Sequence, residues 1–444
     1  MANLRPVRPE RPEQSPPSYG SWFRWLLPHR PHLGQSLPAL ASRDFRIFWL
    51  GQLVSLTGTW IQSVAQQWLV LQLTHSAFKL GLVTAIQFTP LLILSLIGGA
   101  VADRVDKRKL LVATQIVSML LALGLGTLVK TGAVQYWHVL VFAGLLGIVN
   151  AFYTPARQAF VPELVDRDIL MNAVALNSAI FNGARVVGPA IGGLLIATVG
   201  LSLNFYLNAL SFVAVIIGLL VLHTRPTVAE RPSESLLSNV REGLGYVRAT
   251  PVVYTILALI GVTSLFALNF TTLVPVFAQK ILHVGSSGFG FLLASMGVGS
   301  LAGSITIAFL NRRDLARRFI YFGATAFCIA EILFALSHVY ALCVTLLMFV
   351  GVSQTLFTTT ANTRILSLTP SHLQGRVMSV YSLMFLGMTP FGSFLSGLVA
   401  ERYGAPSAFI GGAAITLVFT GLVFALHPSQ RTPEQVEKRA QSES

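Results

Sequence analysis

The chain has 444 residues, and only 11% of them are charged, against about 25% in a typical soluble domain. Its mean hydropathy is +0.68, so it carries too few charges to cover a water-facing surface, which excludes a soluble enzyme and predicts a lipid-embedded protein. The formal net charge of +14 would suggest nucleic acid on a soluble protein, but the basic residues lie between long apolar runs, so we expect no nucleic-acid partner.

The first 40 residues have the composition of a disordered tail. They contain eight of the 21 prolines and no apolar core of the kind found in a cleavable signal peptide. We expect residues 1–40 to be a disordered, proline-rich cytoplasmic tail. Within it, the aromatic and basic residues 22–30 are compatible with a short interfacial helix or with no fixed structure.

Twelve apolar runs follow the tail, each near the 20 residues or so that a helix needs to cross a bilayer. They fall into two sets of six, 41–222 and 251–426, joined by a charged cytoplasmic linker at 223–250 and followed by a second cytoplasmic tail at 427–444. This pattern predicts an all-α membrane protein of twelve transmembrane helices in two pseudo-symmetric six-helix halves. The runs lie near residues 47–73, 80–102, 110–129, 136–155, 173–199, 203–222, 252–277, 287–310, 319–337, 340–360, 377–399 and 406–426.

The basic residues set the expected orientation. If both termini are cytoplasmic, the tails and the loops on that side hold 26 of the 31 lysines and arginines. Only Lys79, Lys130, Lys280 and Arg402 fall on the other side, and Arg185 lies within a span. Because positive charge collects on the cytoplasmic side, this alternation predicts the helix count and two cytoplasmic termini together.

The first span carries a polar stripe. Five residues spaced by three or four positions share one helical face, and amides facing lipid would be costly, so this face must turn toward protein or water. We interpret the stripe as a wall of a substrate cavity; hydrogen bonding between packed helices is the alternative. The stripe consists of Gln52, Ser55, Thr59, Gln62 and Gln66.

The loop between the second and third spans carries the most specific motif. Residues 99–110 read GAVADRVDKRKL, which resembles the loop signature of the major facilitator superfamily, although Asp106 stands where that signature has glycine. The resemblance implies that Gly99, Asp103, Arg104 and Arg108 form a gating loop that holds the outward-open state. For the neighbouring Lys107 and Lys109, we expect a role in topology alone.

Three further stretches narrow the resemblance. The segments 44–55, 155–165 (PARQAFVPELV) and 374–378 (QGRVM) are similar to the branch that contains the enterobactin exporter and related efflux proteins. A weak internal repeat agrees with this fold: Arg157 precedes a proline after the fourth span, and Arg364 precedes one after the tenth. The resemblance covers roughly residues 40–426 and implies a secondary transporter of the bacterial plasma membrane.

The fifth span contains a Gly-Pro motif and a buried charge. Residues Gly188, Pro189, Gly192 and Gly193 resemble the kink motif of drug/proton antiporters, and close helix packing is the plainer reading of the glycines. Asn182 and Arg185 lie about two turns and one turn before this motif, respectively. A charge inside a span is usually functional, so we assign both to the predicted cavity; bonding of Arg185 to backbone carbonyls is the alternative.

The second half supplies fewer candidates. In the tenth span Gln354, Thr358 and Asn362 share one face and complete the predicted cavity. Glu331 is the carboxylate well inside a span and thus the candidate proton carrier, with a packing role as the alternative. Two cysteines, both in apolar runs, and the absence of any Cys/His spacing predict no disulfide, metal or cofactor.

Together these features predict a transporter and no enzyme, since no nucleophile turn or Walker motif occurs. The expected activity is alternating-access export of small amphiphilic compounds or siderophore-like metabolites, driven by protons. We expect a monomer whose partners are its small-molecule cargo, protons and the lipid bilayer. A lipid or lysolipid translocator is the alternative within transport, and a non-transporting membrane sensor is the alternative outside it.

Overall fold

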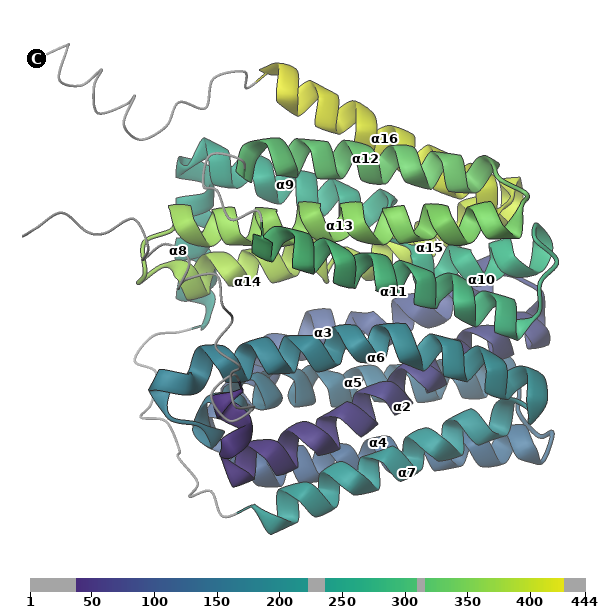
Figure 1. Cartoon of the computed structure of the whole chain (residues 1–444), viewed down its shortest axis with the longest axis horizontal. Coiled ribbons are helices and arrows are strands. Elements are labelled where there is room, and N and C mark those ends of the chain that lie inside the picture. The colour runs from purple at the N-terminus through teal and green to yellow at the C-terminus, as the bar shows by residue number, and fades with distance from the viewer. Residues whose placement is uncertain (1–36, 223–235, 310–315, 427–444) are drawn as a thin grey trace, which may run out of the picture.

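The computed structural model describes residues 37–222, 236–309 and 316–426, and every regular element in these ranges is a helix (Figure 1). The tail before residue 37, residues 223–235 of the linker, the loop at 310–315 and the tail from 427 lie outside the described residues. The long helices are α2 (Arg43–Thr74), α3 (Ala77–Arg104), α4 (Lys107–Lys130), α5 (Tyr136–Phe160), α6 (Leu170–Thr198), α7 (Leu201–Val221), α8 (Leu236–Ala249), α9 (Pro251–Phe266), α10 (Phe270–Lys280), α11 (Ser286–Phe309), α12 (Ala316–Leu336), α13 (Tyr340–Leu368), α14 (Gln374–Phe385), α15 (Thr389–Tyr403) and α16 (Ala405–Leu426).

Eleven segments of the described chain are long and apolar enough to cross a membrane, which agrees with a multi-pass protein. The segments 251–280 and 374–403 each combine two consecutive helices. Helix α2 is not among the eleven although it has 32 residues. Its polar stripe and the charges of its first turn lower its hydropathy, so composition alone does not identify it as a span.

Two predicted spans are interrupted, which corrects the expectation of continuous helices there. The run near 252–277 divides into α9 and α10, and the run near 377–399 divides into α14 and α15. Pro390 stands in the first turn of α15, where its missing N–H leaves no bond to the preceding turn. Pro189, its expected counterpart in the first half, instead lies inside the unbroken α6.

The helices gather in two groups that follow chain order (Figure 1). In the first, α3 packs on α5, α4 on α7, and α2 on both α6 and α7. In the second, α11 and α12 pack on α13, and α16 packs on α9, α12 and α15. The groups meet mainly through α6 with α11 and α3 with α15, and α10 also contacts α2 and α3.

The junction between the groups is closest at the helix ends remote from the start of α2. A Cβ on Gly193 would collide with the Ser286 backbone in α11, and a Cβ on Gly81 would collide with the Ser393 backbone in α15. At the same end, the ring of Trp68 stacks on Phe289 with centroids 5.8 Å apart. Missing side chains therefore permit backbone contact at this end of the junction.

Part of the predicted linker is a helix that docks on the second group. The short α8 packs against α14. The carboxylate of Glu242 pairs with Arg376, and the hydroxyl of Tyr246 donates to the carbonyl of Leu368 at 2.7 Å. The end of the linker is thus fixed to the second group.

Candidate functional site

A cavity of about 320 Å³ lies inside the first group of helices and extends to its junction with the second. Helices α2 to α7 supply nearly all of its lining, and Thr271 of α10 is the contribution of the second group. The lining combines amide and hydroxyl side chains with apolar ones, among them Trp60, Phe88 and Phe181. The cavity therefore suits a ligand that carries several hydrogen-bonding groups.

Paired amides form the walls of the cavity. The Nδ2 group of Asn208 donates to Oε1 of Gln62 at 2.7 Å, which ties α7 to α2. The Nε2 group of Gln66 donates to Oε1 of Gln87 at 3.0 Å, which ties α2 to α3. These bonds hold the amides in fixed positions, and fixed polar groups favour selective binding.

Two further glutamines have unmet hydrogen-bonding capacity. Gln67 on α2 and Gln115 on α4 both line the cavity and are buried. The Oε1 atom of each has no hydrogen-bond partner among the described residues. Buried polar atoms are normally paired, so unpaired ones at a cavity wall indicate a place where a ligand or ordered water completes the bonding.

Arg157 is the cationic residue of the lining, and the sequence reasoning missed it as a cavity residue. The predicted fourth span ended at residue 155, whereas α5 continues to Phe160. On this longer helix Asn150, Tyr153 and Arg157 share one face through spacings of three and four, and that periodicity was the available signal. The Nη1 group of Arg157 donates to Asn177 at 3.4 Å, while its Nε is buried without a partner among the described residues.

The stripe on α2 lies along this cavity. Ser55, Thr59, Gln62 and Gln66 belong to its lining. Gln52, the first residue of the stripe, is buried just beyond the lining and accepts a hydrogen bond from the hydroxyl of Tyr153 at 2.9 Å.

The other predicted cavity residues are not part of this lining. On α6, Asn182 donates to the carbonyl of Ser178 at 3.0 Å, within its own helix. On α13, Thr358 likewise donates to the carbonyl of Gln354 at 2.9 Å. These local bonds replace the contacts across a cavity that the spacing suggested. The residues outside the lining are Asn182, Arg185, Gln354, Thr358 and Asn362.

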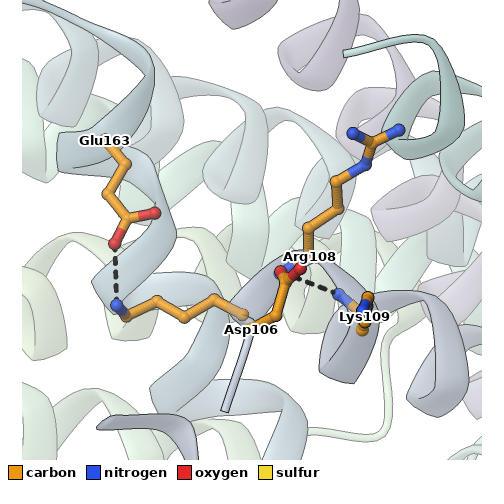
Figure 2. Close-up of polar contacts among 5 residues, drawn as sticks. Asp106, Arg108, Lys109 and Glu163 are labelled. Carbon is orange, nitrogen blue, oxygen red and sulfur yellow. Dashed lines mark hydrogen bonds and ion pairs between the residues drawn. The ribbon is translucent and has the colours of Figure 1, made fainter. Parts of the chain in front are cut away.

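Figure 2 shows polar contacts around the loop between α3 and α4. Asp106, which departs from the signature, caps α4 by accepting from the N–H groups of Arg108 and Lys109 at 2.9 and 3.3 Å. Asp103, the expected hydrogen-bonding carboxylate, has no partner among the described residues. Asp106 can cap α4 because it stands directly before the first turn of this helix, where backbone N–H groups have no partner within the helix.

Two basic residues of this loop make specific contacts. The expectation that Lys107 only sets topology is wrong, because Lys107 is buried and its Nζ lies 2.7 Å from Oε1 of Glu163 (Figure 2). Arg108 donates from Nη2 to the carbonyl of Leu220 at 2.6 Å, at the end of α7. A Cβ on Gly99 would meet nothing within 4 Å, and Arg104 is exposed.

The glycines of the Gly-Pro motif are packing positions. A Cβ on Gly188 would collide with Trp60 of α2, and a Cβ on Gly192 would lie 3.0 Å from the carbonyl of Ile61. A Cβ on Gly193 would collide with the backbone of α11, as described above. Pro189 does not break α6. The missing side chains of the three glycines let α6 approach both α2 and α11 closely.

Glu331 lies far from the cavity lining, inside the second group. It is fully buried on α12, and neither carboxylate oxygen has a partner among the described residues. Its helix packs against α13 and α16. The two cysteines, Cys328 and Cys343, are buried as free thiols.

Comparison with known proteins finds a matching family and several similar transporters. The profile of the transmembrane secretion effector family matches residues 35–442. The chain is 28% identical to a staphyloferrin A transporter of Staphylococcus aureus, over 84% of this chain and 95% of that protein. It is 28% identical to the multidrug efflux pump Tap of Mycolicibacterium fortuitum, over 86% and 95%. It is 26% identical to the enterobactin exporter EntS of Shigella boydii, over 88% and 94%.

Solved structures of the same fold have low sequence identity. A bacterial homologue of the human lysosomal transporter Spinster, in an inward-facing and unoccupied conformation, superposes with a TM-score of 0.68 at 14% identity, over 86% of this chain and 95% of that chain. A POT family transporter in complex with 5-aminolevulinic acid gives a TM-score of 0.71 at 10% identity, over 90% and 98%.

Proposed function

Because the chain belongs to the transmembrane secretion effector family, a branch of the major facilitator superfamily, we propose that it exports small amphiphilic compounds or siderophore-like metabolites by alternating access. The main support for this proposal is the cavity, whose lining includes amide and hydroxyl side chains. Its fixed amides offer binding groups within the membrane, and the aromatic side chains of Trp60 and Phe181 add apolar surface. A lipid translocator is the alternative, and the fixed amides favour a cargo that carries hydrogen-bonding groups.

The proposed architecture is twelve spans in two six-helix halves, 41–222 and 251–426. The charged linker and the weak repeat of Arg157 and Arg364 in the sequence support it. The packing supports it too, since α3 on α5 corresponds to α11 on α13, and α4 on α7 corresponds to α12 on α16. In this scheme α2 is the first span, although its hydropathy is low.

Alternating access then follows from rocking of the halves about the cavity. The close contacts at the remote helix ends correspond to a state closed on that side. With both termini cytoplasmic, as the charge distribution suggests, this is an inward-facing state of a monomer in the bacterial plasma membrane. In the opposite state, we propose that Asp103, Arg104 and Arg108 form contacts that stabilise the outward-open form.

Protons are the proposed driving ion. Glu331 is the candidate carrier because it is a buried carboxylate within a span. Its location outside the cavity lining means that a proton would act through the packing of α12 against its neighbours, and not through direct contact with cargo.

The test is transport by the purified full chain in liposomes. The cargo panel comprises catecholate and carboxylate siderophores and amphiphilic drugs, each measured with and without an imposed pH gradient. We expect directional transport of at least one compound class, faster with the gradient, and a loss of transport when Gln62 and Asn208 are both replaced by alanine. Transport that is absent for the whole panel, or unchanged in the double variant, would refute the proposal.

A further inference from the structure

The charge of the cavity lining limits which classes of ligand can bind there. Arg157 is positively charged at any physiological pH, and the lining contains no aspartate or glutamate to balance it. Lys107 and Glu163 lie on nearby elements but pair with each other. The cavity lining therefore carries a net positive charge.

The guanidinium of Arg157 has bonding capacity to spare. Its Nη1 bond to Asn177 is long, at 3.4 Å, and its contact with the ring of Tyr153 places Cζ 5.9 Å from the ring centroid. Its Nε–H is buried and has no partner among the described residues. An arginine with unmet donors matches the planar, two-oxygen geometry of a carboxylate.

Arg157 and two aromatic residues of the lining lie at different levels of the cavity. Tyr153 bonds Gln52 near the start of α2, so Arg157, one turn further along α5, lies toward that end. From Ser55 to Gln66, both in the lining, α2 rises about 17 Å. Between these ends, Trp60 and Phe181 meet edge to face with centroids 6.3 Å apart, and both line the cavity.

We propose that the cavity selects aromatic carboxylates, with the anionic group bound by Arg157 and the ring packed against Trp60 and Phe181. The inference rests on the proposed function and names its cargo class. An amine cation would meet Arg157 with no carboxylate among the lining residues to offset the repulsion, so the same arrangement rejects cationic analogues.

The experiment measures binding, which separates this proposal from the proposed export. The full chain in lipid nanodiscs is titrated by calorimetry with naphthoate, naphthamide and naphthylmethylammonium, which share one ring system and differ in charge. We expect naphthoate to bind about tenfold more tightly than naphthamide, in keeping with one charge-assisted hydrogen bond. The ammonium compound should bind more weakly still.

Variants assign the preference to Arg157. In Arg157→Gln the advantage of naphthoate over naphthamide should vanish, and Arg157→Lys should retain part of it. Arg364→Gln is the matched control, because Arg364 lies near the end of the corresponding helix α13 of the second half and does not line the cavity. Circular dichroism and the thermal midpoint check that each variant is folded.

The outcomes separate the two proposals. A folded Arg157→Gln variant that keeps the preference would overturn this inference, as would a wild-type protein that does not bind naphthoate or binds the ammonium compound equally well. Selective naphthoate binding without transport of any compound in liposomes would refute export and leave the ligand class intact.

Discussion

The carboxylate of Glu401 accepts a hydrogen bond from the backbone N–H of Ala77 at 2.7 Å, which ties the end of α15 to the start of α3. A second, longer bond comes from the N–H of Phe78 at 3.4 Å. The carboxylate thus caps a helix of the first group from the second group, at the end where the two groups meet. Such a cap is favoured by the partial positive charge of a helix N-terminus.

Removal of this cap should favour the state that is open at that end. Glu401→Ala loses about 1 kcal/mol of bonding, which corresponds to roughly a fivefold change in the ratio of the two states. Glu401→Gln should behave like the wild type, because its amide oxygen also accepts. Spin labels at Thr131→Cys and His338→Cys, both exposed, would report the change as a longer distance, since the native cysteines are buried.

The neighbouring Arg402 provides the control for this experiment. It is exposed on the same turn, so Arg402→Gln should leave the distance distribution unchanged. An equal shift in Arg402→Gln and Glu401→Ala would point to a general effect of charge and would contradict the capping role.

Close packing of glycine should be essential at the same junction. Gly193→Ala places a methyl group against the backbone of Ser286 and Gly290, so we expect it to separate α6 from α11 and to abolish transport. Gly183→Ala is the matched control on α6, because a Cβ there meets nothing within 4 Å. The measurement is transport in liposomes together with the label distance; similar activity of both variants would show that the packing is dispensable.

The pair of Lys107 and Glu163 should stabilise the fold. Loss of one partner leaves a largely buried charge, which costs about 3 kcal/mol. We therefore expect Lys107→Met to lower the thermal midpoint in detergent clearly, and the double variant with Glu163→Gln to recover part of the loss. The exposed Lys109 serves as control, and a Lys109→Met variant as unstable as Lys107→Met would rule out a specific pair.

Glu331→Gln tests the proton carrier. The amide has almost the same shape but cannot release a proton, so the variant should exchange cargo down its gradient and lose the acceleration by an imposed pH gradient. Transport by wild type and variant is compared in the same liposomes with and without that gradient. An unchanged gradient response would exclude Glu331 as the carrier and leave it a packing role.

Periodicity predicted the stripe on α2 because a helix maintains regular spacing whatever its neighbours do. It did not predict Arg157, because the apolar run ends before the helix does. The breaks at 267–269 and 386–388 also escaped prediction, since both lie within apolar sequence and depend on packing between helices. Spacing also does not predict whether Gln354, Thr358 and Asn362 line a cavity, because that depends on which helices pack against their face of α13.

The low hydropathy of α2 has a consequence for biogenesis. Among the long helices of residues 37–426 it is the first to leave the ribosome, and its polar stripe makes it costly to insert into lipid. The glutamines of its polar face find their partners only when α3 supplies Gln87, α5 supplies Tyr153 and α7 supplies Asn208. Stable insertion of α2 must therefore wait for helices made later, so truncation of the nascent chain before residue 208 should leave its first span exposed to membrane quality control.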